Sequence, residues 1–209
     1  MPILMPMLPK FSKKEAISAG WQIFKANWKF LVAVTAISLV ISYAPTAVSQ
    51  AWSNQYPVPA VLFSLIFWVV GLVVSIGLVK IFLNLVDGKA VNFTDLYAYW
   101  RLVWYYLLVQ ILAGIIIFLG LIFLVVPGII FGIRLQFASY YVIDKGLGPL
   151  AAVKASWAAT RGSVRNLFLF GILIGLVYLL GVIVIGVGLL AAIPVSGLAV
   201  AVVYRKLAA

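Results

Sequence analysis

The chain has 209 residues, of which 66% are hydrophobic and 9% are charged, and its formal net charge is +11. Soluble domains are about 45–50% apolar, so this composition excludes an ordinary soluble protein and predicts an integral membrane protein. The sequence has no cysteine and no histidine. That excludes disulfides, thiol nucleophiles and the usual zinc sites. We therefore expect a protein that is not an enzyme, with no cofactor and no metal site.

Apolar runs of about 20 residues recur along the chain, and each is long enough to cross a bilayer core as a helix. They predict an all-α integral membrane protein with six transmembrane helices in one polytopic domain, 1–209. The helices pair as hairpins over 30–85, 103–142 and 165–204. Because the fourth and sixth runs are short, four or five full spans with a re-entrant element is the alternative.

The connections between the predicted spans alternate between basic and uncharged. Lysine and arginine gather before the first span, between the hairpins and after the last span, whereas the turns within hairpins carry no charge. Short basic loops stay in the cytoplasm, so both termini are expected there. The acidic residues fall on the same side: Glu15, Asp87, Asp95 and Asp144. The three aspartates could gather there around a divalent metal, but because they are scattered and stand near lysines we interpret them as solvated caps.

Residues 11–28 are predicted to form an amphipathic helix that lies in the membrane interface. Ser12 and Glu15 have the spacing of a capping box. One face of the helix is aromatic and apolar, and it carries Ile17, Trp21, Phe24 and Trp28. Such a helix places its aromatic side chains towards the acyl chains and its lysines on anionic lipid. The alternative is a cytoplasmic extension of the first span, which would leave the tryptophans in water.

The same local design returns at 149–162 and, more weakly, at 92–101. Superposing Trp157 on Trp21 also aligns two basic residues of each segment. We therefore predict an internal repeat of three units, each an interfacial segment followed by a hairpin. Because these bases flank apolar runs, we expect them to bind anionic phospholipids and not nucleic acid. They are Lys13, Lys14, Lys25, Lys29, Lys154, Arg161 and Arg165.

Arg134 lies inside the fourth predicted span, about two helical turns from the Pro-Gly pair at 127–128. A charge at that depth costs a few kcal/mol and is a functional hypothesis by default. Its guanidinium could snorkel to lipid phosphate, bind backbone carbonyls and polar side chains as a structural pin, or line a wet cavity that meets an anionic substrate or headgroup. The candidate intramembrane polar site comprises Arg134, Gln110, Gln136 and Ser139.

Gly171 and Gly175 have the GxxxG spacing on the fifth predicted span. Small residues let helix backbones approach closely in lipid, where no hydrophobic force joins helices. We expect this pair to serve packing within the chain, and a homo-oligomer interface is the alternative.

The segment 119–162 resembles a large group of prokaryotic membrane proteins, which includes the membrane domain that accompanies some glycerophosphodiester phosphodiesterases. The resemblance rests on a Pro-Gly-Ile hairpin and a Ser-Trp-x-x-Thr-x-Gly signature, matched by Pro127, Gly128, Ile129, Arg134, Asp144, Ser156, Trp157, Thr160 and Gly162. It implies a polytopic domain of the prokaryotic cytoplasmic membrane. The histidines of the phosphodiesterase domain are absent, so the resemblance implies no hydrolase activity.

The sequence thus favours a non-enzymatic protein of the cytoplasmic membrane that binds anionic lipids and has a membrane-organising or accessory role. The alternative function is a transporter or lipid-moving protein in which Arg134 lines a polar path. A peptide-resistance or immunity protein is a third hypothesis, which would need a protein partner.

Overall fold

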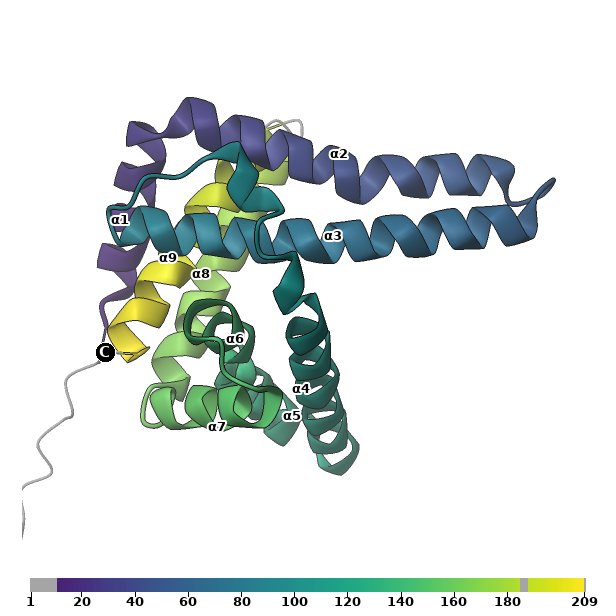
Figure 1. Ribbon diagram of the computed structural model, residues 1–209. Helices are drawn as coiled ribbons and strands as arrows, with labels where there is room; N and C mark the ends of the chain where they lie inside the picture. Colours follow the sequence, from purple (N-terminus) through teal and green to yellow (C-terminus); the bar gives the residue numbers. More distant parts are fainter. Residues whose placement is uncertain (1–10, 185–187, 209) are drawn as a thin grey trace, which may run out of the picture.

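A computed structural model describes residues 11–184 and 188–208, and its regular elements over these residues are all helical (Figure 1). In chain order they are α1 (Lys13–Ala26), α2 (Trp28–Trp52), α3 (Pro57–Val86), the 3-10 turns η1 (Phe93–Leu96) and η2 (Trp100–Leu102), α4 (Val103–Phe123), α5 (Val125–Leu135), α6 (Ala138–Lys145), α7 (Pro149–Ala159), α8 (Val164–Ile183) and α9 (Leu189–Ala208).

Six stretches of helix are long and apolar enough to cross a membrane. They are Trp28–Trp52, Pro57–Val86, Phe93–Phe123, Val125–Lys145, Val164–Ile183 and Leu189–Ala208. The predicted all-α fold with six spans is therefore confirmed. Residues 185–187, between α8 and α9, lie outside the described residues.

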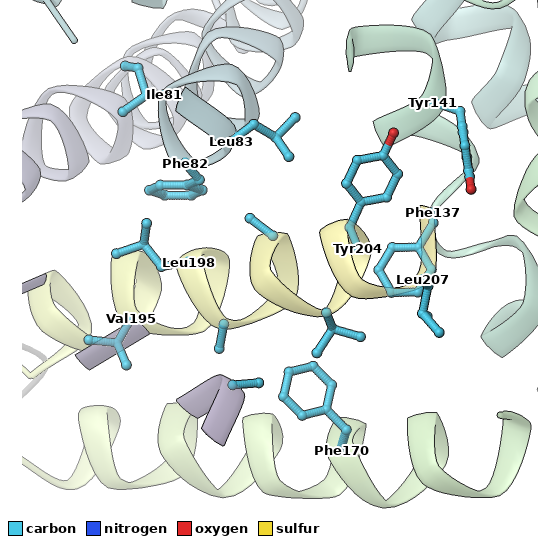
Figure 2. Packing of buried hydrophobic residues seen from close by; sticks show 14 of the residues in the cluster. Ile81, Phe82, Leu83, Phe137, Tyr141, Phe170, Val195, Leu198, Tyr204 and Leu207 are labelled. Carbon is cyan, nitrogen blue, oxygen red and sulfur yellow. The ribbon is translucent and has the colours of Figure 1, made fainter. Parts of the chain in front are cut away.

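The spans pair in chain order as α2 with α3, α4 with α5, and α8 with α9. A short segment precedes each hairpin, and we refer to α1, η1–η2 and α7 as the pre-hairpin segments. The core lies around α9, which contacts α1, α2, α3 and α8. Figure 2 shows buried side chains such as Phe82 of α3 and Phe170 of α8 gathered around Leu198 and Tyr204 of α9.

The α2–α3 hairpin extends well beyond the other helices (Figure 1). Its proximal half, next to α1 and α9, contributes Leu31 and Ile81 to the core. Its distal half, next to the turn, exposes large apolar side chains, among them Val40, Leu62 and Ile66. Exposed apolar surface of this kind is what a hydrocarbon solvent accepts.

Helix α1 packs on the protein through a face that includes one of the aromatic residues predicted to face lipid. Ala16, Gly20 and Phe24 are buried, and α1 lies against α9. The backbones approach so closely that a Cβ on Gly20 would lie 2.8 Å from the carbonyl oxygen of Val195. The prediction that Phe24 faces lipid is therefore wrong, because small residues, rather than the aromatic stripe, set the contact between α1 and α9.

The fourth span is a broken helix made of α5 and α6. Pro127 is in the first turn of α5, where a missing N–H breaks no helical bond. Gly128 lies directly against Leu121 of α4, so the Pro-Gly pair allows the tight approach of α4 and α5. The helix is interrupted after Leu135 and resumes at Ala138.

Close helix packing through Gly171 and Gly175 is absent from the described part of the chain. A Cβ placed on either glycine would meet nothing within 4 Å, so the expected role in packing within the chain is wrong. The contact between α8 and α9 is made instead at Gly181, whose Cβ would lie 2.8 Å from that of Ala192.

The predicted segment 92–101 is not one amphipathic helix but two 3-10 turns, η1 and η2. Asp95 accepts a hydrogen bond of 3.0 Å from the backbone N–H of Asn92 and so caps η1. The segment crosses α3 at Gly77, where any side chain would clash with the backbone of Leu96.

Candidate functional site: Arg134 and the pre-hairpin segments

The break between α5 and α6 leaves the carbonyl of Arg134 without its usual helical partner, and α7 supplies a replacement. Ser156 donates a hydrogen bond of 2.6 Å from its hydroxyl to this carbonyl, and the hydroxyl of Thr160 lies 3.4 Å from it. Both hydroxyl residues are fully buried. A side chain that forms a hydrogen bond with a backbone group of a helix is a common cause of a helix break. The two residues at the break, Gln136 and Phe137, are not helix breakers such as proline or glycine.

The guanidinium of Arg134 stacks on the indole ring of Trp157. Its Cζ lies 4.4 Å from the ring centroid, a cation–π geometry worth about 0.5–2 kcal/mol. The ring of Phe131 packs against the same tryptophan at 5.5 Å. No carboxylate among the described residues lies within ion-pair distance of Arg134, and its Nε is buried without a hydrogen-bond acceptor.

Three members of the signature that carries the family resemblance therefore surround one residue. Ser156, Trp157 and Thr160 all contact Arg134, from the carbonyl to the guanidinium. Gly162 follows with a φ of 80°, a conformation that favours glycine and turns the chain towards α8. Through these contacts the signature joins α7 to the end of α5, and we refer to them as the lock.

We expect Ser156→Ala to lower the free energy of unfolding by about 1–2 kcal/mol, because it leaves the buried carbonyl of Arg134 with only the longer contact to Thr160. The measurement is denaturation of the purified protein in mixed micelles. The matched control is Ser18→Ala on the exposed surface of α1, which should change stability by less than about 0.5 kcal/mol. Equal stability of the two variants would contradict the lock.

The other residues of the predicted intramembrane polar site do not gather around Arg134. The hydroxyl of Ser139 donates to the amide oxygen of Gln110 at 3.0 Å and joins α6 to α4. Gln136 donates to the carbonyl of Ile133 in its own helix at 2.8 Å. The alternative in which polar side chains hold the guanidinium of Arg134 is therefore wrong about its partners. The guanidinium packs instead on the aromatic ring of Trp157 of α7.

On α1 and the first turn of α2, the exposed surface combines aromatic rings with lysines. Trp21 and Trp28 are 46% and 53% exposed, and the Nζ of Lys29 lies 5.9 Å from the ring centroid of Trp28. Lys14, Lys25 and Lys29 are exposed, and Lys13 is half-buried. The capping of α1 by Ser12 is confirmed, since its hydroxyl accepts from the N–H of Glu15.

The other two pre-hairpin segments also expose basic and aromatic side chains. Lys154, Arg161 and Arg165 are exposed on α7 and at the start of α8. In η1–η2, Tyr97 and Trp100 are 61% and 60% exposed. Trp157, in contrast, is turned inwards under Arg134, so it does not occupy the same environment as Trp21.

A cluster that the sequence did not predict joins the ends of α3, α6 and α9. Arg205 forms two hydrogen bonds with Asp87, of 2.8 and 2.7 Å, and two with Asp144, of 2.6 and 3.0 Å. The hydroxyl of the fully buried Tyr204 donates to Asp144 at 3.0 Å. The interpretation of Asp87 and Asp144 as solvated caps is therefore wrong, because a bidentate arginine lies between them.

The remaining acidic residue of α1 also has a basic partner. Glu15 pairs with Lys206 of α9 at 2.9 Å on the surface. No group of three or more acidic side chains that could hold a metal ion occurs in the described part of the chain. The arrangement can therefore bind anions at exposed bases, while its carboxylates are used within the protein.

Together, the fold and these sites define a multi-pass helical membrane protein with basic and aromatic pre-hairpin segments. No family model matches the chain, so its resemblance to the phosphodiesterase-associated group stays a prediction. No solved structure matches it.

Similar proteins occur in mycobacteria. The chain is 27% identical over 225 aligned positions to an uncharacterized protein of Mycobacterium tuberculosis strain H37Rv, which covers 94% of this chain and 69% of the relative. An uncharacterized protein of Mycobacterium bovis is similar to the same extent. The similarity therefore extends over most of this chain. The names of these relatives give no functional description, so they indicate nothing about its activity.

Proposed function

We propose that this protein is a non-enzymatic, multi-pass protein of the prokaryotic cytoplasmic membrane that binds anionic phospholipids through its pre-hairpin segments. Both termini lie in the cytoplasm, and the protein has a membrane-organising or accessory role. The observation that carries the proposal is the exposed surface of α1 and of the first turn of α2. There Trp21 and Trp28 alternate with Lys14, Lys25 and Lys29, although the opposite side of α1 is packed on α9.

The docking of α1 supports an interfacial position. Tryptophan prefers the headgroup level, where its ring is partly apolar and its N–H is wet. Each basic residue near an anionic surface contributes about 1 kcal/mol of attraction. Because α1 is already held by α9, its backbone is ordered before lipid binds, so binding costs no further backbone entropy in this helix.

The contacts of Arg134 support an anchoring role more than a transport role. Its guanidinium is covered on one side by Trp157, and its predicted polar neighbours Gln110 and Ser139 are paired with each other. An arginine that is stacked on an indole ring remains free to bind a phosphate at its edge. Within the proposal, Arg134 therefore extends the basic surface of α7 towards the acyl chains.

The test compares lipid selectivity of the wild-type protein with that of Lys25→Gln combined with Lys29→Gln. Reconstituted protein is studied by electron spin resonance with spin-labelled phosphatidylglycerol and phosphatidylcholine. The wild type should restrict the motion of the anionic lipid preferentially. The double variant should lose up to about thirtyfold of this selectivity, since two attractions of about 1 kcal/mol each are removed.

Two matched variants separate the effect of position from that of net charge. Lys89→Gln combined with Lys145→Gln removes the same charge outside the pre-hairpin segments and should leave most of the selectivity. Lys25→Arg combined with Lys29→Arg keeps the charge at both positions and should retain the selectivity. Equal selectivity of the wild type and the variant with glutamine at positions 25 and 29, or equal losses from the two glutamine variants, would contradict the proposal.

A further inference from the structure

The distal half of the α2–α3 hairpin contains a groove that the proposed function does not use. The groove encloses about 910 Å³ between the two helices and is open along one side. Its polar lining comes from both helices and includes Ser42, Thr46, Ser49, Gln50, Ser64 and Ser75. None of the described residues that line it is charged.

Several polar groups in this groove have no partner in the described part of the chain. The hydroxyls of Ser64 and Ser75 donate to carbonyls of their own helix at 2.8 Å. No side-chain hydrogen bond to another described residue is formed by Ser42, Thr46 or the carboxamide of Gln50. Most of the groove's lining is apolar, but a hydrocarbon solvent offers these polar groups no hydrogen bond, so they are poorly matched to acyl chains.

The groove continues a face of α2 that is already used for helix packing. Thr35, Ser38, Ser42 and Thr46 follow one another at spacings of three, four and four residues, and so they lie in the same helical row. Thr35 and Ser38 are buried in the proximal half of α2, which contacts α3 and α9. In the distal half the same row is exposed, because α9 does not extend over it (Figure 1). This row of α2 therefore has α9 as a neighbour over its proximal half but not over its distal half.

We propose that two copies of this chain form a dimer in which the distal halves of their α2–α3 hairpins pair through this groove. A hydroxyl or a carboxamide is both donor and acceptor, so the groove is complementary to a copy of itself across a two-fold axis. Side chains as small as serine also permit a close approach of helices in lipid. The absence of charge in the lining argues against an anionic headgroup as the occupant.

The test uses disulfide cross-linking, because the sequence has no cysteine. Single cysteines are placed in the groove by Thr46→Cys and Ser64→Cys, and on the outer surface of the same helices by Val40→Cys and Ile66→Cys. Val40 and Ile66 are 63% and 62% exposed, so both control thiols are accessible. Membranes that contain each variant are oxidised and the covalent dimer is quantified.

We expect covalent dimers at Thr46→Cys and Ser64→Cys and few at the two control positions. Equal cross-linking at all four positions, or none at the groove, would overturn the proposal. A thiol at Thr46→Cys that reacts fully with a membrane-impermeant reagent in the unoxidised protein would also overturn it, since the groove would then be filled with water.

A second measurement does not depend on cysteine geometry. Ser64→Leu combined with Gly71→Leu fills the groove. The substitution at Ser64 removes only a side-chain hydrogen bond to a carbonyl of its own helix, and a Cβ on Gly71 meets nothing within 4 Å. The wild type should have the mass of a dimer in nanodiscs, and this variant should dimerise about tenfold more weakly. A dimer that persists in this variant but is lost with Gly171→Leu and Gly175→Leu on α8 would place the interface elsewhere and reject the proposal.

Discussion

Arg205→Gln is expected to lower the free energy of unfolding by about 2–4 kcal/mol, one of the largest effects of any single substitution in the chain. The change removes all four hydrogen bonds to Asp87 and Asp144. Two carboxylates, whose side chains are 22% and 11% exposed, then repel each other without a cation between them. Breaking a buried pair costs about 3–5 kcal/mol, and the partial exposure of this cluster reduces that figure. The measurement is denaturation in mixed micelles.

The control and the reversal of this effect use residues of the same helix. Lys206→Gln removes the surface pair with Glu15 and should cost less than about 1 kcal/mol. Adding Asp87→Asn and Asp144→Asn to Arg205→Gln neutralises the whole cluster and should restore part of the lost stability. A loss no larger for Arg205→Gln than for Lys206→Gln would show that the cluster does not join the three hairpins.

Gly20→Val is expected to detach α1 from α9. The new side chain would meet the carbonyl oxygen of Val195 at 2.8 Å and the backbone nitrogen of Ala199 at 3.0 Å. Backbone atoms cannot move aside as flexible side chains do, so we expect a loss of at least about 1–3 kcal/mol. The measurement is the unfolding free energy, together with the rate at which a protease cleaves α1 in the folded protein.

Gly114→Val on α4 is the matched control, since a Cβ there meets nothing within 4 Å. It makes the same change of side chain in a helix and should leave stability and proteolysis of α1 nearly unchanged. Rapid cleavage of α1 in both variants, or in neither, would contradict the tight contact between α1 and α9.

The number and positions of the spans could be predicted because they depend only on the length and apolar content of each run. The interruption after Leu135 could not, since no local breaker stands there. It depends on the hydroxyl of Ser156, which lies far along the chain and reaches the carbonyl of Arg134 only in the folded state. The pattern of apolar residues along the fourth span contains no information about this long-range hydrogen bond.

The aromatic residues of residues 11–28 were predicted to face the acyl chains, and this prediction was wrong for Phe24, which is buried against the protein. In lipid, small residues mark the close contacts between helices, and Ala16 and Gly20 provided that signal. The same spacing of small residues at Gly171 and Gly175 makes no contact within the described chain. The pattern alone therefore indicates a surface that permits close approach, but not the helix that uses it.

The cluster around Arg205 was missed for a different reason. Each carboxylate stands beside a lysine in sequence, Lys89 near Asp87 and Lys145 next to Asp144, so a local ion pair or a solvated cap was the simplest interpretation. In the structure Lys89 does contact Asp87 at 3.3 Å, but the stronger geometry comes from an arginine of the last helix. The signal available in the sequence was that both carboxylates and Arg205 end a span on the same predicted side.

The measurement that tests the central claim most directly is the depth of α1 in the bilayer. Spin labels are attached to single cysteines at Trp21→Cys and Gln22→Cys in protein reconstituted with phosphatidylglycerol, and their depth is determined from collisions with oxygen and with a water-soluble nickel complex. We expect the label at position 21 to lie at the headgroup level and to be more accessible to oxygen than the label at position 22. The label at position 22 should be more accessible to the nickel complex. Full accessibility of both positions to the nickel complex would place α1 in water and contradict the proposed lipid-binding surface.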